Sequence, residues 1–245
     1  MIVFPMAGLS RRFSDEGYSV QKFMLPLWGG TVFDYAVSSF SSKFSDVRFL
    51  FIYRETGGVR EFMEERVMAL GINHAVFVEL THATAGQAET VELGLDQSSI
   101  ASDEPLTIFN IDTFRMPTIV PKGVPSNTDG WLEVFHGTGE NWSFVRPVEG
   151  EQLAAETAEK LAISDLCCTG LYHFATAKLF RDALTLERTN PSTLELYIAP
   201  IYNHLIGLGI RIGYGIVESD DVVFCGVPSE YEDLRARPQP YELAD

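Results

Sequence analysis

The first residues suited to chemistry stand near the N-terminus, where Gly8 is followed by Arg11, Arg12 and Lys22. Gly8 comes just after a short apolar run, and a glycine there lets the backbone approach a ligand while loop N–H groups hold phosphate oxygens. Arg12 and Lys22 are suited to neutralise the charge that builds up on a transferred phosphoryl group and on pyrophosphate. The segment is neither a Walker loop nor a G-x-G-x-x-G loop. The structural alternative is a surface loop with solvated arginines.

Two further segments carry candidate residues. Gly86 and Gln87 precede a stretch of helical periodicity, and the donor and acceptor of Gln87 suit the edge of a pyrimidine base. Asp112 follows the apolar run 106–111, where a carboxylate is suited to Mg²⁺ because this ion prefers oxygen ligands and keeps waters and phosphate oxygens as the others. Both segments also have structural readings, with Thr84 and Asp112 acting as caps.

Apolar runs that alternate with helical stretches must position these residues. In the first half of the chain, short apolar runs predict strands at 2–5, 47–53, 75–80 and 106–111. Helical spacing of apolar residues predicts helices at 32–44, 59–70 and 87–95. We expect Thr31 to cap the first helix and Gly71 to end the second. The pattern predicts an α/β fold with a mixed, mainly parallel sheet covered on both faces. Such sheets bind ligands beyond the carboxyl ends of their strands, where the three candidate segments fall.

The pattern changes after about residue 127. Short strands at 131–135 and 142–147 are joined by the glycine-containing segment 137–141, which predicts a hairpin. Further on, we expect strands at 166–174, 211–217 and 222–225, helices at 176–186 and 194–208, and an irregular tail at 238–245.

The N-terminal segment resembles the opening of the sugar nucleotidyltransferase family, which includes nucleoside-diphosphate-sugar pyrophosphorylases and phosphocholine cytidylyltransferases. The matching residues are Pro5-Met6-Ala7-Gly8, Arg12-Phe13 and Lys22-Phe23-Met24-Leu25-Pro26-Leu27. The resemblance implies that Ala7, Gly8 and Ser10 contact the nucleotide and that Arg12 and Lys22 contact and activate the triphosphate. Ser10 stands where the family usually has a second glycine, and Gln21 replaces a proline, but neither departure removes a charge.

The same resemblance implies a Rossmann-like, GT-A-type three-layer fold with a small acceptor-side lobe. Because the sequence shows no repeat or linker, we expect a single domain over 1–245. Its donor-binding lobe would cover about 1–125, its acceptor-side lobe about 126–210, and a closing segment 211–237.

In the family, the segment that resembles Gly86-Gln87 reads the nucleobase, and the aspartate matched by Asp112 holds magnesium beside the α-phosphate. Asn110 departs from a full Asp-x-Asp. Family members usually carry a second aspartate near the C-terminal end, where this chain has Cys225 or Gly226. A thiolate suits softer metals than magnesium, so the candidates for a second carboxylate are the neighbouring Asp220, Asp221 and Glu218.

The acceptor residues are also implied by resemblance. Glu159 and Lys160 precede a Gly-x-Tyr-x-Phe strand that begins at Gly170, as in the acceptor pocket of the family. There the glutamate receives hydrogen bonds from sugar hydroxyls and the lysine contacts the acceptor phosphate. Glu156 is a nearby competitor for the carboxylate role, and adjacent Glu-Lys pairs are commonly solvated surface.

Composition limits the class of protein. The chain has 245 residues and a net charge of −16, which argues against a nucleic-acid groove. Three cysteines without a framework or zinc spacing argue against a disulfide scaffold. No apolar run approaches a membrane helix, and we expect a cytoplasmic enzyme that binds no membrane. The sequence is compatible with a homo-oligomer.

These observations predict a Mg²⁺-dependent nucleotidyltransferase that joins a nucleoside triphosphate to a sugar 1-phosphate or a related phosphorylated acceptor. Three alternatives remain: a cytidylyltransferase for a non-sugar phosphate, a GT-A-type glycosyltransferase, and a nucleotide-binding regulatory subunit without catalysis. The glycosyltransferase would be expected to carry a fuller Asp-x-Asp and has no need of the loop from Gly8 to Lys22. A role in supplying polysaccharide precursors is an analogy with the family only.

Overall fold

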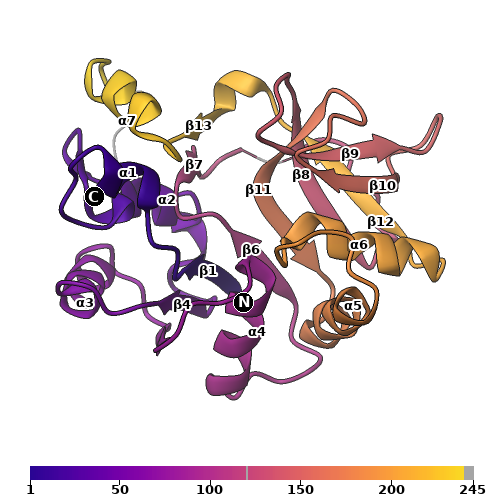
Figure 1. Ribbon diagram of the computed structural model, residues 1–245, viewed down its shortest axis with the longest axis horizontal. Helices are drawn as coiled ribbons and strands as arrows, with labels where there is room; N and C mark the ends of the chain where they lie inside the picture. The colour runs from indigo at the N-terminus through magenta and orange to yellow at the C-terminus, as the bar shows by residue number, and fades with distance from the viewer. Residues whose placement is uncertain (120, 240–245) are drawn as a thin grey trace.

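A nine-stranded sheet lies at the centre of the computed structural model, which describes residues 1–119 and 121–239 (Figure 1). Its main path runs β10-β9-β11-β6-β1-β4-β5, and β8 joins β11 to β12. The strands are β1 Ile2–Met6, β4 Phe49–Tyr53, β5 Ala75–Glu79, β6 Leu106–Phe109, β8 Gly130–His136, β9 Ser143–Pro147, β10 Ala154–Glu159, β11 Leu166–Phe174 and β12 Ile212–Ile216. Strands β5, β4, β1 and β6 are parallel, whereas β11 runs antiparallel to β6, β8 and β9.

Helices cover both faces of the sheet and form three layers with it (Figure 1). The helices are α1 Arg11–Asp15, α2 Val32–Ser38, α3 Val59–Ala69, α4 Gln87–Gln97, α5 Ala177–Thr189, α6 Ile198–Gly207 and α7 Pro228–Arg235, with 3₁₀ turns η1 Lys22–Met24, η2 Ser41–Lys43 and η3 Ser219–Asp221. Two small ribbons pair β2 Pro26–Leu27 with β3 Gly30–Thr31 and β7 Thr113–Arg115 with β13 Val222–Phe224. The predicted α/β class with a mixed sheet is confirmed.

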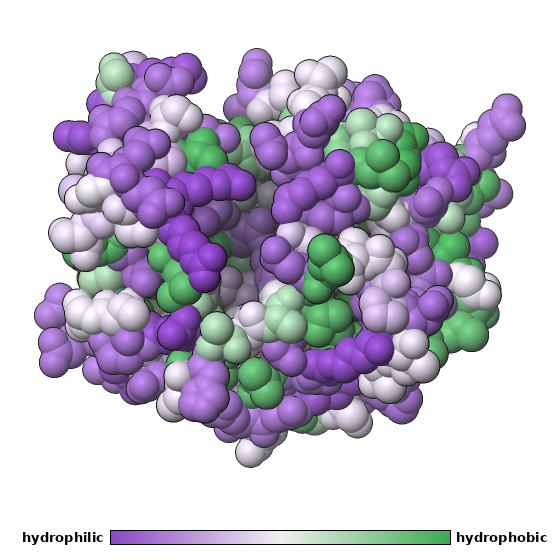
Figure 2. All heavy atoms as spheres, viewed as in Figure 1, coloured by the Kyte–Doolittle hydropathy of each residue, from purple (hydrophilic) through white to green (hydrophobic). Residues whose placement is uncertain are grey.

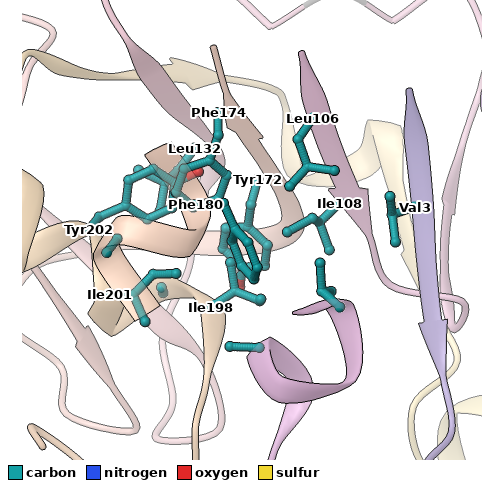
Figure 3. Packing of buried hydrophobic residues seen from close by; sticks show 14 of the residues in the cluster. Val3, Leu106, Ile108, Leu132, Tyr172, Phe174, Phe180, Ile198, Ile201 and Tyr202 are labelled. Atoms are coloured by element: carbon teal, nitrogen blue, oxygen red, sulfur yellow. The ribbon is translucent and has the colours of Figure 1, made fainter. Parts of the chain in front are cut away.

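The two largest hydrophobic clusters follow from the alternation of side chains along each strand. Val3 and Ile108 face α4, α5 and α6, where Figure 3 shows them packed in one cluster with Phe180 and Ile198. Phe4 belongs to the opposite cluster, beneath α2 and α3. Successive residues of a strand point to opposite faces, so a continuously apolar strand such as β1 feeds both cores.

Two helix signals in the sequence act as expected. Thr31 caps α2 in a reciprocal box, because its side chain accepts from the Asp34 N–H and the Asp34 carboxylate accepts from the Thr31 N–H. Gly71, at φ +71°, follows the last residues of α3. The predicted helix 32–44 is interrupted, however: α2 ends at Ser38 and the 3₁₀ turn η2 follows. The side chain of Ser39 donates to the Tyr35 carbonyl at this break.

The predicted hairpin of 131–135 with 142–147 is wrong, because β11 lies between β8 and β9. Cys167 pairs with Phe135 of β8 on one side and with Phe144 of β9 on the other. Every residue of β11 except His173 is buried, and a strand apolar on both faces belongs in the middle of a sheet. Because β8 and β9 are both antiparallel to β11, they run in the same direction, and 137–141 carries the chain across β11 instead of turning it back along β8.

Strand β10 was not expected from the sequence, since Ala and Glu are depleted in strands. It forms because β9 pairs with it and α6 covers it. The side chain of Asn203 accepts from the Thr157 N–H at 2.8 Å and donates to the Thr157 carbonyl at 2.8 Å. These tertiary contacts place Glu159, at the end of β10, where it can face a ligand.

Residues 240–245, most of the expected irregular tail, lie outside the described residues. Within the described part of the chain, no helix has the length and apolar character needed to cross a membrane.

Candidate active site

Two adjoining cavities open beyond the carboxyl ends of β1 and β6. The first, of about 640 Å³, is lined by the loop after β1 and by the start of α4. The second, of about 460 Å³, is lined by β9, β10, β11 and the start of α7. Six residues line both cavities: Arg12, Lys22, Gln87, Asn110, Asp112 and Tyr197. We call these six residues the junction; Figure 2 shows the hollow on this face, with hydrophilic side chains around its rim.

The loop after β1 is shaped by two residues that depart from the family pattern. Ser10 adopts the left-handed conformation, φ +48°, that a glycine would take without strain. Its hydroxyl donates to the Gln21 side-chain oxygen at 2.8 Å and accepts from the Lys22 N–H at 3.3 Å. Ser10 and Gln21 therefore hold together the two ends of the loop that carries Arg12 and Lys22.

The junction contains an ion pair between Lys22 and Asp112. The Lys22 ammonium donates to Asp112 Oδ2, and the two side chains are 23% and 19% exposed. Asp112 follows β6 and is fixed from the other side, because its carbonyl accepts from the Cys225 N–H at 2.8 Å. The sequence prediction that these residues meet at the end of the sheet agrees with this arrangement.

Gly86 has a structural reason for being glycine. A Cβ at this position would lie 2.5 to 2.8 Å from backbone atoms of Leu196. The segment of Leu196 binds the start of α4 through hydrogen bonds to Ala85 and Ala88. The close approach of these two backbones brings Tyr197 into the junction.

Gln87 and Gly170 act together on Asn110, the residue that interrupts the Asp-x-Asp pattern. The Gln87 amide donates to Asn110 Oδ1 at 2.6 Å, and the Asn110 N–H donates to the Gly170 carbonyl at 3.1 Å. Gly170 has φ +99°, and a Cβ there would lie 2.4 Å from Asn110 Nδ2. Gln87 therefore lies in the junction with its amide already oriented by a neighbour.

Glu159 reaches the second cavity with a side chain that is only 10% exposed. Burial raises the pKa of this carboxyl, and the hydrogen bond from Ser143 opposes part of the rise. Lys160 lines neither cavity; its ammonium donates to the Tyr197 hydroxyl at 2.7 Å, a bond that raises the lysine pKa. Glu156 pairs with Arg146 on the surface and also lines neither cavity.

The structure does not bring Asp220 or Asp221 into the cleft, because neither lines either cavity. In the β13–β7 ribbon Phe224 pairs with Thr113, next to Asp112, and the chain then runs away from Asp112 toward Asp221. The three residues of β13 lie between Asp221 and Cys225, and the four residue steps of extended chain span about 13 Å. Glu218 precedes this turn and pairs with Lys122 at the surface. The prediction of a second carboxylate at 218–221 therefore finds no support in the fold.

Gly226 and Glu230 occupy the place beside Asp112 instead. A Cβ at Gly226 would lie 3.2 Å from Asp112 Oδ2 and 3.7 Å from Glu230 Oε2. Glu230 lines the second cavity but was not singled out from the sequence. The neighbouring Cys225 thiol is kept protonated, because burial and the charge of Asp112 raise its pKa to about 12.

A divalent cation would fit the oxygen side of this junction. Asp112 offers a hard carboxylate, and the absent Gly226 side chain leaves space beside it. Across the two described ranges, no group of three or more His, Cys, Asp and Glu side chains is arranged to hold a metal ion. Substrate and water oxygens would therefore have to supply the remaining ligands.

Arg54 is a further cation of the first cavity that the sequence reading missed. It follows β4 directly, beside β1, so the rule on the carboxyl ends of parallel strands could have found it. Within the described residues Arg11, Arg12 and Arg54 form no ion pair, although the chain has 34 acidic and 18 basic residues. Unpaired cations that line one cavity in an acid-rich chain indicate an anion site.

Comparisons with known proteins agree with this geometry. No family model matches the sequence, and no curated protein matches it. The crystal structure of the nucleoside-diphosphate-sugar pyrophosphorylase from Vibrio cholerae RC9 matches with a TM-score of 0.91 and 43% identity, covering 97% of this chain and 100% of that chain.

Two more distant structures show the fold alone. The inositol-1-phosphate CTP transferase from T. maritima matches with a TM-score of 0.74 and 18% identity over 95% of this chain and 93% of that chain. UDP-glucose pyrophosphorylase complexed with UDP-glucose matches with a TM-score of 0.71 and 15% identity, over 96% of each chain.

The contact at Gly86 gives a stability prediction. We expect Gly86→Ala to lower the free energy of unfolding by about 1–3 kcal/mol, because the added methyl overlaps the Leu196 backbone. Urea denaturation measures this change. Gly8→Ala is the matched control, since no atom lies within 4 Å of its added Cβ, and should leave stability unchanged. Equal stability of the two variants would show that the close contact at Gly86 does not hold.

Proposed function

The chain belongs to the nucleoside-diphosphate-sugar pyrophosphorylase family, and we propose that it joins a nucleoside triphosphate to a sugar 1-phosphate, releasing pyrophosphate. The observation that carries this proposal is the junction, where Arg12, Lys22 and Asp112 stand between two cavities of ligand size. Transfer between two substrates needs such a shared boundary, because the reacting atoms must meet while each substrate keeps its own pocket.

The first cavity suits the nucleoside triphosphate. The backbone of Ala7, Gly8 and Ser10 lines it beside the start of α4, and Gly86 and Gln87 lie opposite. Four cations line it, Arg11, Arg12, Lys22 and Arg54, and they offset locally the net charge of −16. We assign the base to the side of Gly86 and Gln87 and the phosphates to the cations.

The second cavity suits the acceptor. Glu159 can accept hydrogen bonds from sugar hydroxyls, and the backbone of Gly170 leads the acceptor toward the junction. Lys160 acts indirectly, since its ammonium donates a hydrogen bond to the hydroxyl of Tyr197, a residue of the junction. We assign Lys160 to positioning Tyr197 rather than to direct contact with the sugar.

The chemistry is an in-line displacement. A phosphate oxygen of the acceptor attacks the α-phosphorus, a new P–O bond forms, and the bond to the β-phosphate oxygen breaks to release pyrophosphate. No protein nucleophile or general base is required, because a phosphate monoester is already ionised near neutral pH. Arg12 and Lys22 stabilise the charge on the leaving group.

Asp112 would hold Mg²⁺, which supplies neutralisation of the α-phosphate and pyrophosphate oxygens when bound. Asp112 then provides a carboxylate ligand for the cation, and the ammonium of Lys22 leaves Asp112 and pairs with the phosphates. The three thiols, Cys167, Cys168 and Cys225, are free and buried, which is compatible with the reducing cytoplasm proposed here. The nucleotide sugar formed is a donor for glycosyl transfer, as in polysaccharide synthesis.

A direct assay tests the proposed function. The protein is incubated with Mg²⁺, each of the five common nucleoside triphosphates and a panel of sugar 1-phosphates and non-sugar phosphates, and pyrophosphate is measured. Pyrophosphate release that requires a sugar 1-phosphate supports the proposal. Release only with a non-sugar phosphate, cleavage of a nucleotide sugar to a nucleoside diphosphate, or nucleotide binding without release would each contradict it.

Lys22 should be required for turnover. We expect Lys22→Ala to lower kcat about 100- to 1,000-fold, because an ammonium that stabilises the leaving pyrophosphate is lost. Steady-state pyrophosphate release measures kcat, and circular dichroism checks that the fold persists. Lys43→Ala, at an exposed residue outside both cavities, should keep normal turnover. Near-normal kcat in Lys22→Ala would overturn the assignment of the loop.

Arg54 should contribute to nucleotide binding. We expect Arg54→Gln to raise the KM for the nucleoside triphosphate about 10- to 100-fold, the size expected when a hydrogen bond to a charged group is lost. The KM for the sugar phosphate should change less. Arg211→Gln removes an exposed arginine outside both cavities and serves as the control. An unchanged nucleotide KM in Arg54→Gln would exclude this role.

Glu159 should set the pH dependence of acceptor binding. Because burial raises its pKa above the ordinary 4.5, the carboxylate is protonated at a higher pH than an exposed glutamate. The acceptor KM should therefore rise as pH falls through this raised pKa, because protonated Glu159 accepts hydrogen bonds less well. Glu159→Gln should have a high KM at every pH, without the rise that protonation of Glu159 causes. Titration of the acceptor phosphate affects both proteins equally, so the ratio of their KM values isolates Glu159.

Glu156→Gln is the matched control for this measurement, because Glu156 pairs with Arg146 outside the cavities. It should follow the unaltered protein at every pH. If Glu159→Gln also followed the unaltered protein, Glu159 would not contact the acceptor.

A further inference from the structure

We propose that Glu230 is the second carboxylate of the divalent-cation site, in place of the acidic turn at 219–221. This inference rests on the proposed function, since it assumes that Asp112 takes the cation used in nucleotidyl transfer. It concerns a residue that the sequence analysis did not single out.

The space beside Asp112 is bounded by Glu230. The position that a Cβ of Gly226 would occupy lies 3.2 Å from Asp112 Oδ2 and 3.7 Å from Glu230 Oε2. The two carboxylates therefore border one small gap that the protein leaves open because residue 226 has no side chain. Mg²⁺ binds oxygens at about 2.1 Å and keeps several waters, so such a gap can be bridged directly or through one bound water.

Glu230 is held in place before any cation arrives. Its Oε2 accepts from the Gly226 N–H at 2.8 Å and from the Val227 N–H at 3.2 Å, at the beginning of α7. No hydrogen bond or ion pair to Oε1 is found within the described part of the chain, so this oxygen remains available as a ligand. A carboxylate with one oxygen fixed by backbone and one oxygen available is pre-organised for coordination.

The local charge also favours a divalent ion. In the free protein, the charge of Lys22 neutralises the charge of Asp112. Glu230 lines the same cavity as Asp112 and forms no ion pair within the described residues. Once Lys22 turns to the phosphates, Asp112 and Glu230 leave two negative charges beside one gap. A divalent cation compensates both charges, whereas a monovalent ion compensates only one.

Mn²⁺ binding tests the inference without relying on turnover. Electron paramagnetic resonance of free Mn²⁺ gives the dissociation constant for the unaltered protein and for Asp112→Asn, Glu230→Gln and Asp221→Asn. We expect both Asp112→Asn and Glu230→Gln to weaken binding about tenfold or more, and Asp221→Asn to leave it unchanged. Glutamine keeps an oxygen for the N–H groups of Gly226 and Val227, so α7 should remain capped, and thermal melting checks this.

The outcomes separate the two proposals. Weakened binding in Asp112→Asn with normal binding in Glu230→Gln would overturn the role of Glu230 and leave the proposed function intact. Normal binding in Asp112→Asn, or no Mn²⁺ binding by the unaltered protein, would contradict the metal role of Asp112 itself. A loss in Asp221→Asn alone would return the second ligand to the acidic turn.

A second measurement uses the unaltered protein. Fe²⁺ placed in the site with ascorbate and peroxide cleaves the backbone near the bound ion, and mass spectrometry locates the cuts. We expect cuts near Asp112 and between Gly226 and Glu230, and none near Asp221. Cuts near Asp221 without cuts at 226–230 would overturn the inference.

Discussion

The ion pair between Lys22 and Asp112 is the interaction on which the site depends. It joins the loop after β1 to the residues after β6, two segments 90 residues apart that meet because β1 and β6 are parallel neighbours. The pair also lies at the boundary of the two cavities, so its atoms face both of them. In the proposed reaction, phosphates would replace Asp112 as the partner of Lys22, and a divalent ion would replace Lys22 as the partner of Asp112.

Close backbone approach gives this boundary its shape. Gly86 lets the Leu196 segment lie against the start of α4, Gly170 makes room for Asn110, and Gly226 leaves a gap beside Asp112. At Gly86 and Gly170 a Cβ would overlap packed protein atoms, whereas at Gly226 it would fill the gap beside Asp112. The first two glycines therefore serve packing, and the third leaves space for a ligand.

The charge of the chain and the charge of the site have opposite signs. Many basic side chains form ion pairs with acids, whereas Arg11, Arg12 and Arg54 form none within the described residues and line the first cavity. An acidic surface keeps long polyanions away, while a local group of cations still attracts a small triphosphate. The overall negative charge therefore favours a small triphosphate over a long polyanion and does not oppose the proposed reaction.

The sequence by itself determined the features that depend on neighbouring residues: the buried strand before Gly8, the Thr31 cap, the strand end at Asp112 and the α/β class. It also led to the family, because the loop from Ala7 to Lys22 is one continuous segment. Only the tertiary structure decided that β11 separates β8 from β9, that Lys160 donates a hydrogen bond to Tyr197, and that Glu230 rather than Asp221 borders the gap beside Asp112. The reason is physical: caps, turns and apolar runs are set by local backbone preferences, whereas strand partners and converging side chains are set by which buried surfaces pack together across the whole chain.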